Sequence, residues 1–344
     1  MRSFLLLTAL PAAIAGCAAD PDAPVSADPP PVEGMHSRSL NFSYEATIRD
    51  IPSGTAALDV WIPIPPSDDE QTISDLRFEG PVAPVLTSEN VFKNRMAHFH
   101  LAPTAAAAGP FRISFRATRR GVVHRPAPGP EALLSDSERA LLAPLLRPDR
   151  RGAIDDTVWT IAAEVTTGRE GAGNRGRAIY DYVESTMRYD KTGEGWGQGD
   201  TRFACSEKRG NCTDFHALFM SVARAAGIPA RFEMGFSIPT DRTEGPIAGY
   251  HCWMRFHQPG GGWIPVDASE GWKQKERREY FFGALDENRI LFTRGRDIVL
   301  APPQKGPPLN YFIHPYVEAD GVPHAAVDRS YGFKELPVRA GGGR

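Results

Sequence analysis

The sequence predicts an α+β protein in which a small β-sandwich precedes a larger part made of helices and an antiparallel sheet. Apolar and polar residues alternate over residues 39–123, helical periodicity follows, and short strands recur after residue 230. The counts of 33 Gly and 31 Pro favour many turns over a helical bundle. With 41% hydrophobic residues the chain can bury a sizeable core, and a net charge of -3 gives no reason to expect nucleic acid as a partner.

The first residues indicate an export signal. Arg2 precedes an apolar run over residues 4–14, which is too short to span a bilayer. The run ends in small residues directly before Cys17, and this pattern resembles the lipobox of bacterial lipoproteins. The resemblance implies a signal peptide over residues 1–16 and a lipid anchor on Cys17, because several acyl chains on one residue bind stably to a membrane. An ordinary signal peptide with an incidental cysteine is the alternative.

Residues 17–38 are rich in Pro, Ala and Asp and have few large apolar side chains. They are predicted to form an extended tether, and residues 333–344 a disordered tail. Ala18, rather than Asp, follows the lipobox cysteine. The sorting rule of such lipoproteins therefore implies a location on the periplasmic face of the outer membrane. Envelope proteins or peptides would be the partners within reach of a protein anchored there.

Strands of period two define the predicted sandwich, residues 39–123. The apolar positions of three such strands are Leu40, Phe42, Tyr44, Ala46 and Ile48, then Leu58, Val60, Ile62 and Ile64, then Phe111, Ile113, Phe115 and Ala117. The alternation stops after Val123, and a proline-rich linker leads into a second domain over residues 131–325.

Helices are expected to open the second domain, over 135–144, near 158–165 and over 174–188. A further amphipathic helix starts near Cys212, and the sequence Gly227-Ile228-Pro229 ends it. Strands are then expected over 230–236, 250–256 and 263–266.

Cys212, His251 and Asp267 are candidates for nucleophilic chemistry. Cys212 lies at a predicted helix start, where free amides and the helix dipole lower the pKa of a thiol and can hold an oxyanion. A thiolate nucleophile also needs a proton acceptor that is held in orientation. His251 and Asp267 lie on or next to two neighbouring predicted strands, which would bring them side by side.

Three motifs around these residues resemble those of the transglutaminase-like superfamily. The first is Arg209–Phe215 followed by Ala223–Arg231, the second is Tyr250–Trp253, and the third is Gly262–Ser269. They occur in the order of that family, and the resemblance covers roughly residues 170–300.

The resemblance implies a papain-like core without a cofactor. It assigns Cys212 as nucleophile, His251 as base and Asp267 as the acid that orients it. It also implies a cysteine peptidase or amidase that forms a thioester on a protein or peptide substrate. Two alternatives stay open, namely a protein cross-linking acyltransferase and a non-catalytic lipoprotein that binds partners in the envelope.

Further residues have less specific signals. A second oxyanion donor could come from Trp196 or Gln198 in the glycine-rich loop, although Trp196 could equally pack or line a groove. An oxidising compartment permits a disulfide between Cys205 and Cys252, and the alternative is two free thiols. Because side chains alternate along a strand, Cys252 is expected to face away from His251. The spacing of the Cys and His residues fits no familiar zinc pattern, so no metal is predicted.

Overall fold

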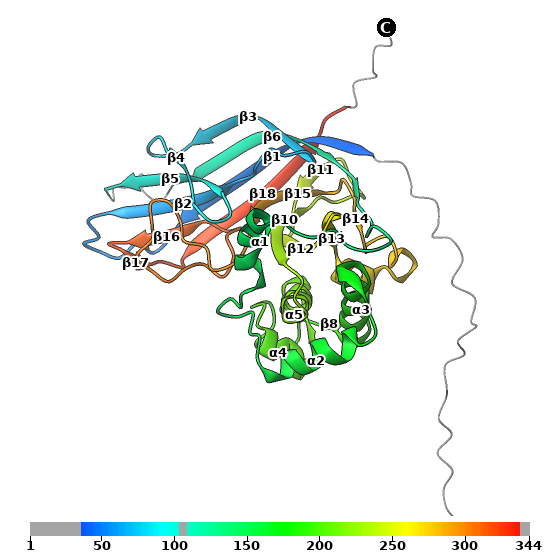
Figure 1. Cartoon of the computed structure of the whole chain (residues 1–344). Coiled ribbons are helices and arrows are strands. Elements are labelled where there is room, and N and C mark those ends of the chain that lie inside the picture. The colour runs from blue at the N-terminus through cyan, green and yellow to red at the C-terminus, as the bar shows by residue number, and fades with distance from the viewer. Residues whose placement is uncertain (1–35, 103–108, 338–344) are drawn as a thin grey trace, which may run out of the picture. The chain divides into compact units, whose positions relative to one another are not determined.

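The computed structural model describes residues 36–102 and 109–337 (Figure 1). The predicted signal peptide, the predicted lipid attachment site Cys17 and nearly all of the predicted tether lie outside these residues, as does the end of the predicted tail. The described residues all belong to one compact unit. None of the helices in the described ranges is both long and apolar enough to span a membrane.

Two antiparallel sheets form the predicted sandwich, here called the long sheet and the short sheet. The long sheet has the strand order β11-β18-β1-β6-β3, and the short sheet β17-β16-β2-β5-β4. The long sheet contains β1 (Ser37–Ile48), β3 (Gln71–Glu79), β6 (Phe111–Arg120), β11 (Glu244–Pro246) and β18 (Val327–Glu335). The short sheet contains β2 (Leu58–Ile64), β4 (Val85–Ser88), β5 (Arg95–Leu101), β16 (Tyr316–Ala319) and β17 (Val322–Pro323). All the alternating apolar residues named for the predicted strands are buried, which confirms their inward orientation.

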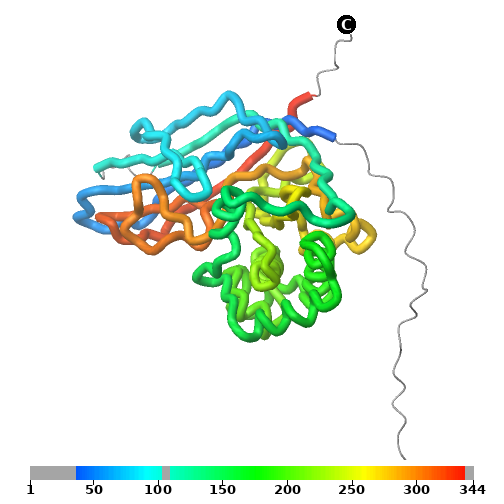
Figure 2. The backbone as a smooth tube through the Cα atoms, in the orientation of Figure 1, coloured from blue at the N-terminus to red at the C-terminus, as the bar shows by residue number. Residues whose placement is uncertain are grey.

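The predicted limits of the sandwich need correction, because strands from the C-terminal part complete both sheets. Strand β18 pairs with β1, and β16 pairs with β2. The segment predicted to be disordered from residue 333 therefore begins inside β18, which ends at Glu335. Periodicity shows that a segment is a strand but does not show which partner fills its free edge. As a result, the two ends of the described chain lie together (Figure 2).

A third sheet, here called the core sheet, has the order β13-β12-β10-β15. It contains β10 (Ala230–Ser237), β12 (Tyr250–Gln258), β13 (Gly262–Val266) and β15 (Arg289–Arg294). Helix α5 (Cys212–Ala225) packs against one face, where the rings of Phe219 and Phe256 are 6.2 Å apart. Other helices surround α5, namely α2 (Asp156–Thr166), α3 (Gly171–Thr186), α4 (Thr201–Glu207) and α6 (Ala268–Lys273).

The long sheet covers both the short sheet and the core sheet. Phe42 on β1 packs against Phe236 and Phe292 of the core sheet, with ring centroids 5.4 and 5.5 Å apart. Phe111 on β6 packs against Phe99 of the short sheet, at 5.0 Å. One hydrophobic core therefore runs through both predicted domains, and the linker between them does not separate two independent cores.

Smaller elements fill the connections. Helix α1 (Asp136–Leu142) has Ser135 as its N-cap, and the side chains of Ser135 and Glu138 form a capping box. The remaining elements are η1 (Ala143–Leu146), η2 (Lys275–Arg277), the pair β7 (Val122–Val123) and β14 (Ala284–Leu285), and the parallel pair β8 (Arg188–Tyr189) and β9 (Arg209–Gly210).

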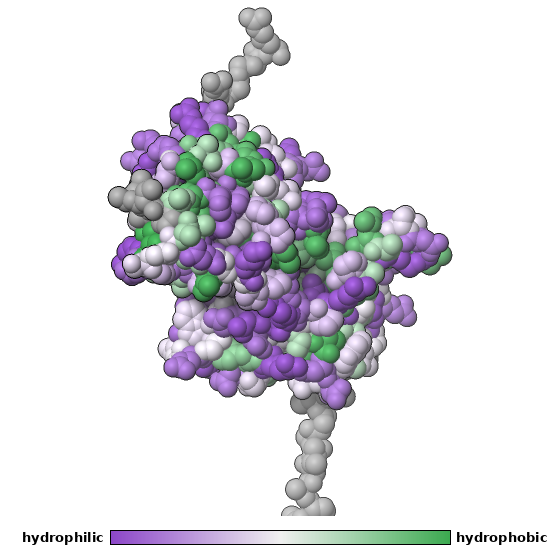
Figure 3. Space-filling model, turned by 90° about the vertical axis from the view of Figure 1, so that its left-hand side faces the viewer, coloured by the Kyte–Doolittle hydropathy of each residue, from purple (hydrophilic) through white to green (hydrophobic). Residues whose placement is uncertain are grey.

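The surface of the sandwich carries some exposed apolar side chains, among them Val85 and Leu86 on β4. Figure 3 looks onto this end of the molecule and shows green groups interrupted by purple ones. Isolated apolar side chains of this kind are normal for a protein surface and identify no partner.

Candidate functional site

Cys212 is the first residue of α5 and is 3% exposed. Asn211 caps the helix, and its side-chain oxygen accepts the Thr213 amide at 2.9 Å. Within the described chain, the Cys212 amide donates to no protein acceptor. A free amide and the positive end of the helix dipole therefore meet at the thiol, as the sequence predicted.

Asp214 fixes the backbone around this helix start. Its buried carboxylate accepts the amides of Asn211 at 2.9 Å, Gly197 at 2.6 Å and Gly199 at 3.0 Å. Gly210 is required here, because its φ is +147° and a Cβ would lie 2.2 Å from the Asp214 carboxylate. Asp214 thus ties the glycine-rich loop to the turn that carries Cys212.

His251 and Asp267 lie in contact, as expected for residues on neighbouring strands. His251 is on β12 and Asp267 directly follows β13, and the two strands pair antiparallel. His251 Nε2 and Asp267 Oδ2 are 2.7 Å apart, and both side chains are buried. The hydrogen bond occupies Nε2, so Nδ1 is the ring nitrogen left for Cys212.

The Asp267 carboxylate has further partners that hold it in place. Oδ1 accepts the Ser269 hydroxyl and the Glu270 amide, both at 3.0 Å. Arg289 on β15 donates to Oδ2 from 3.0 Å and is itself buried. Burial raises the pKa of Asp267, but His251 and Arg289 lower it more, so the carboxylate is ionised.

The neighbouring charges make Cys212 and His251 an ion pair. A hydrogen bond from Cys252 lowers the pKa of Cys212, and His251 adds to this effect against the opposing effect of burial. The pKa of Cys212 thus lies well below its usual value. Burial lowers the pKa of His251, but Asp267 and Cys212 together raise it to about 10. These shifts favour a thiolate on Cys212 beside an imidazolium on His251.

A second cysteine and histidine lie on the other side of Asp267. His216 on α5 is fully buried, and its Nε2 accepts the Ala268 amide at 3.1 Å. Its Nδ1 is 3.5 Å from the Cys252 thiol. Burial lowers the pKa of His216 and raises that of Cys252, so this second pair is neutral.

The predicted disulfide between Cys205 and Cys252 is absent from the described structure, in which both residues are free thiols. Strand alternation correctly places Cys252 away from His251. The face to which Cys252 points is covered by the first turn of α5, where its thiol contacts Thr213 and His216. Cys205 lies on α4, which is a different element around α5.

The contacts of Trp196 and Gln198, the two predicted oxyanion donors, are with residues other than Cys212 in the described structure. The Trp196 indole donates to the Gly193 carbonyl at 3.0 Å, within its own loop. Gln198 is exposed, and its backbone carbonyl accepts a hydrogen bond from the Asn310 side-chain amide. The glycine-rich loop does contact the helix start, because the backbone amides of Gly197 and Gly199 donate to Asp214.

Tyr250 is a neighbour of Cys212 that the sequence analysis assigned no role. Its hydroxyl is 3.2 Å from both the Asn211 amide nitrogen and the Thr213 hydroxyl, the side chains on either side of Cys212. The sequence does single out Tyr250 by position, because it directly precedes His251 in the second motif. Arg289 lies outside the three motifs and had no such signal in the sequence, because its role depends on the tertiary structure.

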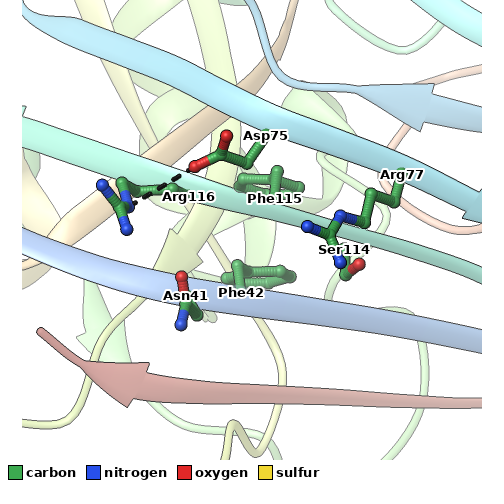
Figure 4. A pocket seen from close by; sticks show the side chains of 7 residues that line it. All are labelled: Asn41, Phe42, Asp75, Arg77, Ser114, Phe115 and Arg116. Atoms are coloured by element: carbon green, nitrogen blue, oxygen red, sulfur yellow. Dashed lines mark ion pairs between the residues drawn. The ribbon is translucent and has the colours of Figure 1, made fainter.

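The surface of the described residues includes two cavities of similar volume. One of about 390 Å³ lies on the long sheet over β1, β3 and β6, where Asp75 and Arg116 form an ion pair at 3.7 Å (Figure 4). None of the residues around Cys212, His251 and Asp267 lines this cavity. The other, of about 400 Å³, includes Tyr250 in its wall and therefore adjoins the Cys212 turn. Within 36–102 and 109–337, no three His, Cys, Asp or Glu side chains are placed to hold a metal ion.

The chain is similar in sequence to two known bacterial proteins. The chain is 29% identical over 182 residues to an uncharacterized protein of Haemophilus influenzae, covering 44% of this chain and 49% of that one. It is 24% identical over 133 residues to the uncharacterized protein YebA of Bacillus subtilis, covering 35% of this chain and 18% of that one. The matches thus span about half or less of these relatives.

A solved structure shares the fold. A candidate cysteine protease from Cytophaga hutchinsonii superposes with a TM-score of 0.58 at 14% identity, covering 89% of this chain and 92% of that one. The family model of the transglutaminase-like superfamily matches residues 160–268, which include Cys212, His251 and Asp267. These residues form a transglutaminase-like core domain, and the fold of the chain is shared with that solved structure.

Proposed function

We propose that this protein is a cysteine hydrolase that cleaves amide or peptide bonds through a thioester on Cys212. The observation that carries the proposal is the buried 2.7 Å hydrogen bond between His251 Nε2 and Asp267. It orients the ring so that Nδ1 is the nitrogen available to the thiol, whose pKa is already low. Acyl transfer requires an oriented base, a thiol with a lowered pKa and a free amide that can stabilise an oxyanion. All three meet at the start of α5.

In the first half of the proposed reaction, the Cys212 thiolate attacks the carbonyl carbon of an amide. The Cys212 amide stabilises the oxygen that gains charge. The C–N bond then breaks, and His251 gives its Nδ1 proton to the leaving amine. In the second half, His251 takes a proton from water, and the hydroxide formed attacks the thioester. The C–S bond then breaks, and the products are a carboxylic acid and the Cys212 thiolate beside protonated His251.

A library of fluorogenic peptide amides tests this proposal, with a primary amine added in a parallel arm. Hydrolysis predicts release of free acid by wild type, and no release by Cys212→Ala. A new amide with the added amine as the main product would instead support cross-linking acyl transfer. If Cys212→Ala cleaves as fast as wild type, the proposed mechanism is wrong.

We also propose that the enzyme is anchored in the bacterial envelope through Cys17, so that it acts on envelope proteins or peptides. The support is the lipobox-like sequence that ends in Cys17. Labelled palmitate should be incorporated into the wild-type chain in cells and lost in Cys17→Ser. Incorporation that survives Cys17→Ser would contradict the anchor.

A further inference from the structure

The cavity beside Tyr250 is placed to receive part of a substrate. It has a volume of about 400 Å³. Ile247 and Tyr250 form one side of it, and His314, Arg329 and Tyr331 are among the residues that complete the wall. Strand β12 and the segment before it thus supply one side, while β18 and the segment before β16 supply the other.

Tyr250 connects this cavity to the reacting thiol. Its hydroxyl lies 3.2 Å from the side chains of Asn211 and Thr213, which precede and follow Cys212. The residue after Tyr250 is His251, the proposed base. A substrate whose carbonyl carbon lies at Cys212 would therefore place a neighbouring group at or near the cavity.

Arg329 gives the cavity its charge. Its side chain is exposed and forms no ion pair or side-chain hydrogen bond within the described residues. The adjacent Asp328 pairs with Arg49 at 2.8 Å instead. No Asp or Glu lines the cavity, so nothing in its wall neutralises the guanidinium.

The other polar groups of the wall are uncharged at neutral pH. Burial lowers the pKa of His314 to about 3, and Arg329 adds to this effect. Nδ1 of His314 is 2.8 Å from the Tyr331 hydroxyl. Burial raises the pKa of that hydroxyl to about 12. The cavity therefore combines one free cation with aromatic walls, which suits an aliphatic stem that ends in a carboxylate.

We propose that this cavity is a substrate subsite that binds a carboxylate next to the scissile amide, with Arg329 as the residue that selects it. The carboxylate belongs either to an acidic side chain or to the free end of a short peptide. Arg329 makes a charge-assisted hydrogen bond to it, and the rings of Tyr250 and Tyr331 contact the carbons that carry it. This inference rests on the hydrolase proposed above and names its class of substrate.

Three peptidyl acyloxymethyl ketones would test the subsite, because they label a reactive thiol without turnover. One carries glutamate beside the reactive carbonyl, one carries glutamine there, and one is a short probe with a free terminal carboxylate beside that position. Rates of Cys212 labelling are measured by intact mass for wild type, Arg329→Gln and Arg329→Lys. Arg77→Gln is the matched control, since Arg77 is also exposed, lies at the other cavity and has no ion pair within the described residues.

We expect wild type to react about tenfold faster with at least one carboxylate probe than with the glutamine probe. Which of the two carboxylate probes is faster identifies the source of the carboxylate. The preference should disappear in Arg329→Gln, survive in part in Arg329→Lys, and persist in Arg77→Gln.

Equal rates for all probes in wild type, or a preference that survives Arg329→Gln, would overturn the subsite. In those cases labelling of Cys212 still occurs, so the hydrolase proposal stands. If no probe labels Cys212 while iodoacetamide does, both proposals are wrong.

Discussion

Two cysteine–histidine pairs lie on either side of Asp267, and only one of them is charged. Cys212 and His251 form the charged pair, whereas Cys252 and His216 form the neutral one. All four side chains are buried, so burial does not explain the difference.

The groups that contact each Nε2 explain it. His251 Nε2 faces the Asp267 carboxylate at 2.7 Å, which favours the protonated ring. His216 Nε2 instead accepts a backbone amide at 3.1 Å and lies 3.6 Å from Asp267 Oδ1. An amide donor at Nε2 requires that nitrogen to be unprotonated. A cysteine beside a histidine is therefore not enough for a thiolate, because the second ring nitrogen decides the charge.

The largest expected effect comes from removing each thiol in turn. Cys212→Ala should abolish amide hydrolysis, because no other thiol of the cluster is ionised at neutral pH. Cys252→Ala should keep activity within about tenfold of wild type, since it removes one hydrogen bond to the thiolate. Hydrolysis of fluorogenic peptide amides measures both. Loss of activity in Cys252→Ala with retention in Cys212→Ala would reverse the assignment.

Asp267→Asn should lower kcat/KM by about 10²–10⁴-fold, because the neutral amide neither raises the pKa of His251 nor fixes its tautomer. Circular dichroism and the thermal midpoint check that the variant is folded. Asp286→Asn serves as a control, since Asp286 also contacts Arg289 but not His251. Equal activity of wild type and Asp267→Asn would show that Asp267 does not orient the base.

Arg289→Met leaves the Asp267 carboxylate buried without its second cationic partner. Removing one member of a buried ion pair should lower the free energy of unfolding by about 3 kcal/mol, measured by urea titration. The exposed Arg77→Met should change the same quantity by less than about 0.5 kcal/mol. A change as small in Arg289→Met as in Arg77→Met would mean that the Asp267–Arg289 bond contributes nothing to the stability of the fold.

The smallest effect concerns the pKa of Cys212. In wild type the alkylation rate should rise with pH through this pKa, well below 9, and then reach a plateau. Cys252→Ala removes a hydrogen bond to the thiolate, so the pKa of Cys212 should rise. The increase in alkylation rate should then occur about one pH unit higher than in wild type. The pH dependence of iodoacetamide labelling at Cys212 measures the shift, and Cys205→Ala is the control. An unchanged pH dependence would show that Cys252 does not stabilise the thiolate.

Much of the fold could be predicted from the sequence, because local patterns carry it. The alternation in β1 and β6, the capping residue Ser135 and the helix beginning at Cys212 all appear where the sequence indicates them. The return of β18 to β1 could not be predicted, since pairing between strands about 290 residues apart leaves no local pattern.

The candidate site divides in the same way. Cys212, His251 and Asp267 lie in motifs and could be singled out, and strand alternation correctly set Cys252 apart from His251. The disulfide prediction failed because alternation does not show what covers the opposite face, here the first turn of α5. Arg289 reaches Asp267 from β15, a contact that only the assembled core sheet creates.

The most direct test of the account is to map the covalent intermediate. The protein is incubated with a peptide thioester or activated amide, quenched in acid, digested and analysed by mass spectrometry. The account predicts one acyl group, on Cys212, which hydroxylamine removes and which Cys212→Ala lacks. An acyl group on Cys252 or Cys205, or an unchanged acyl yield in Cys212→Ala, would contradict it.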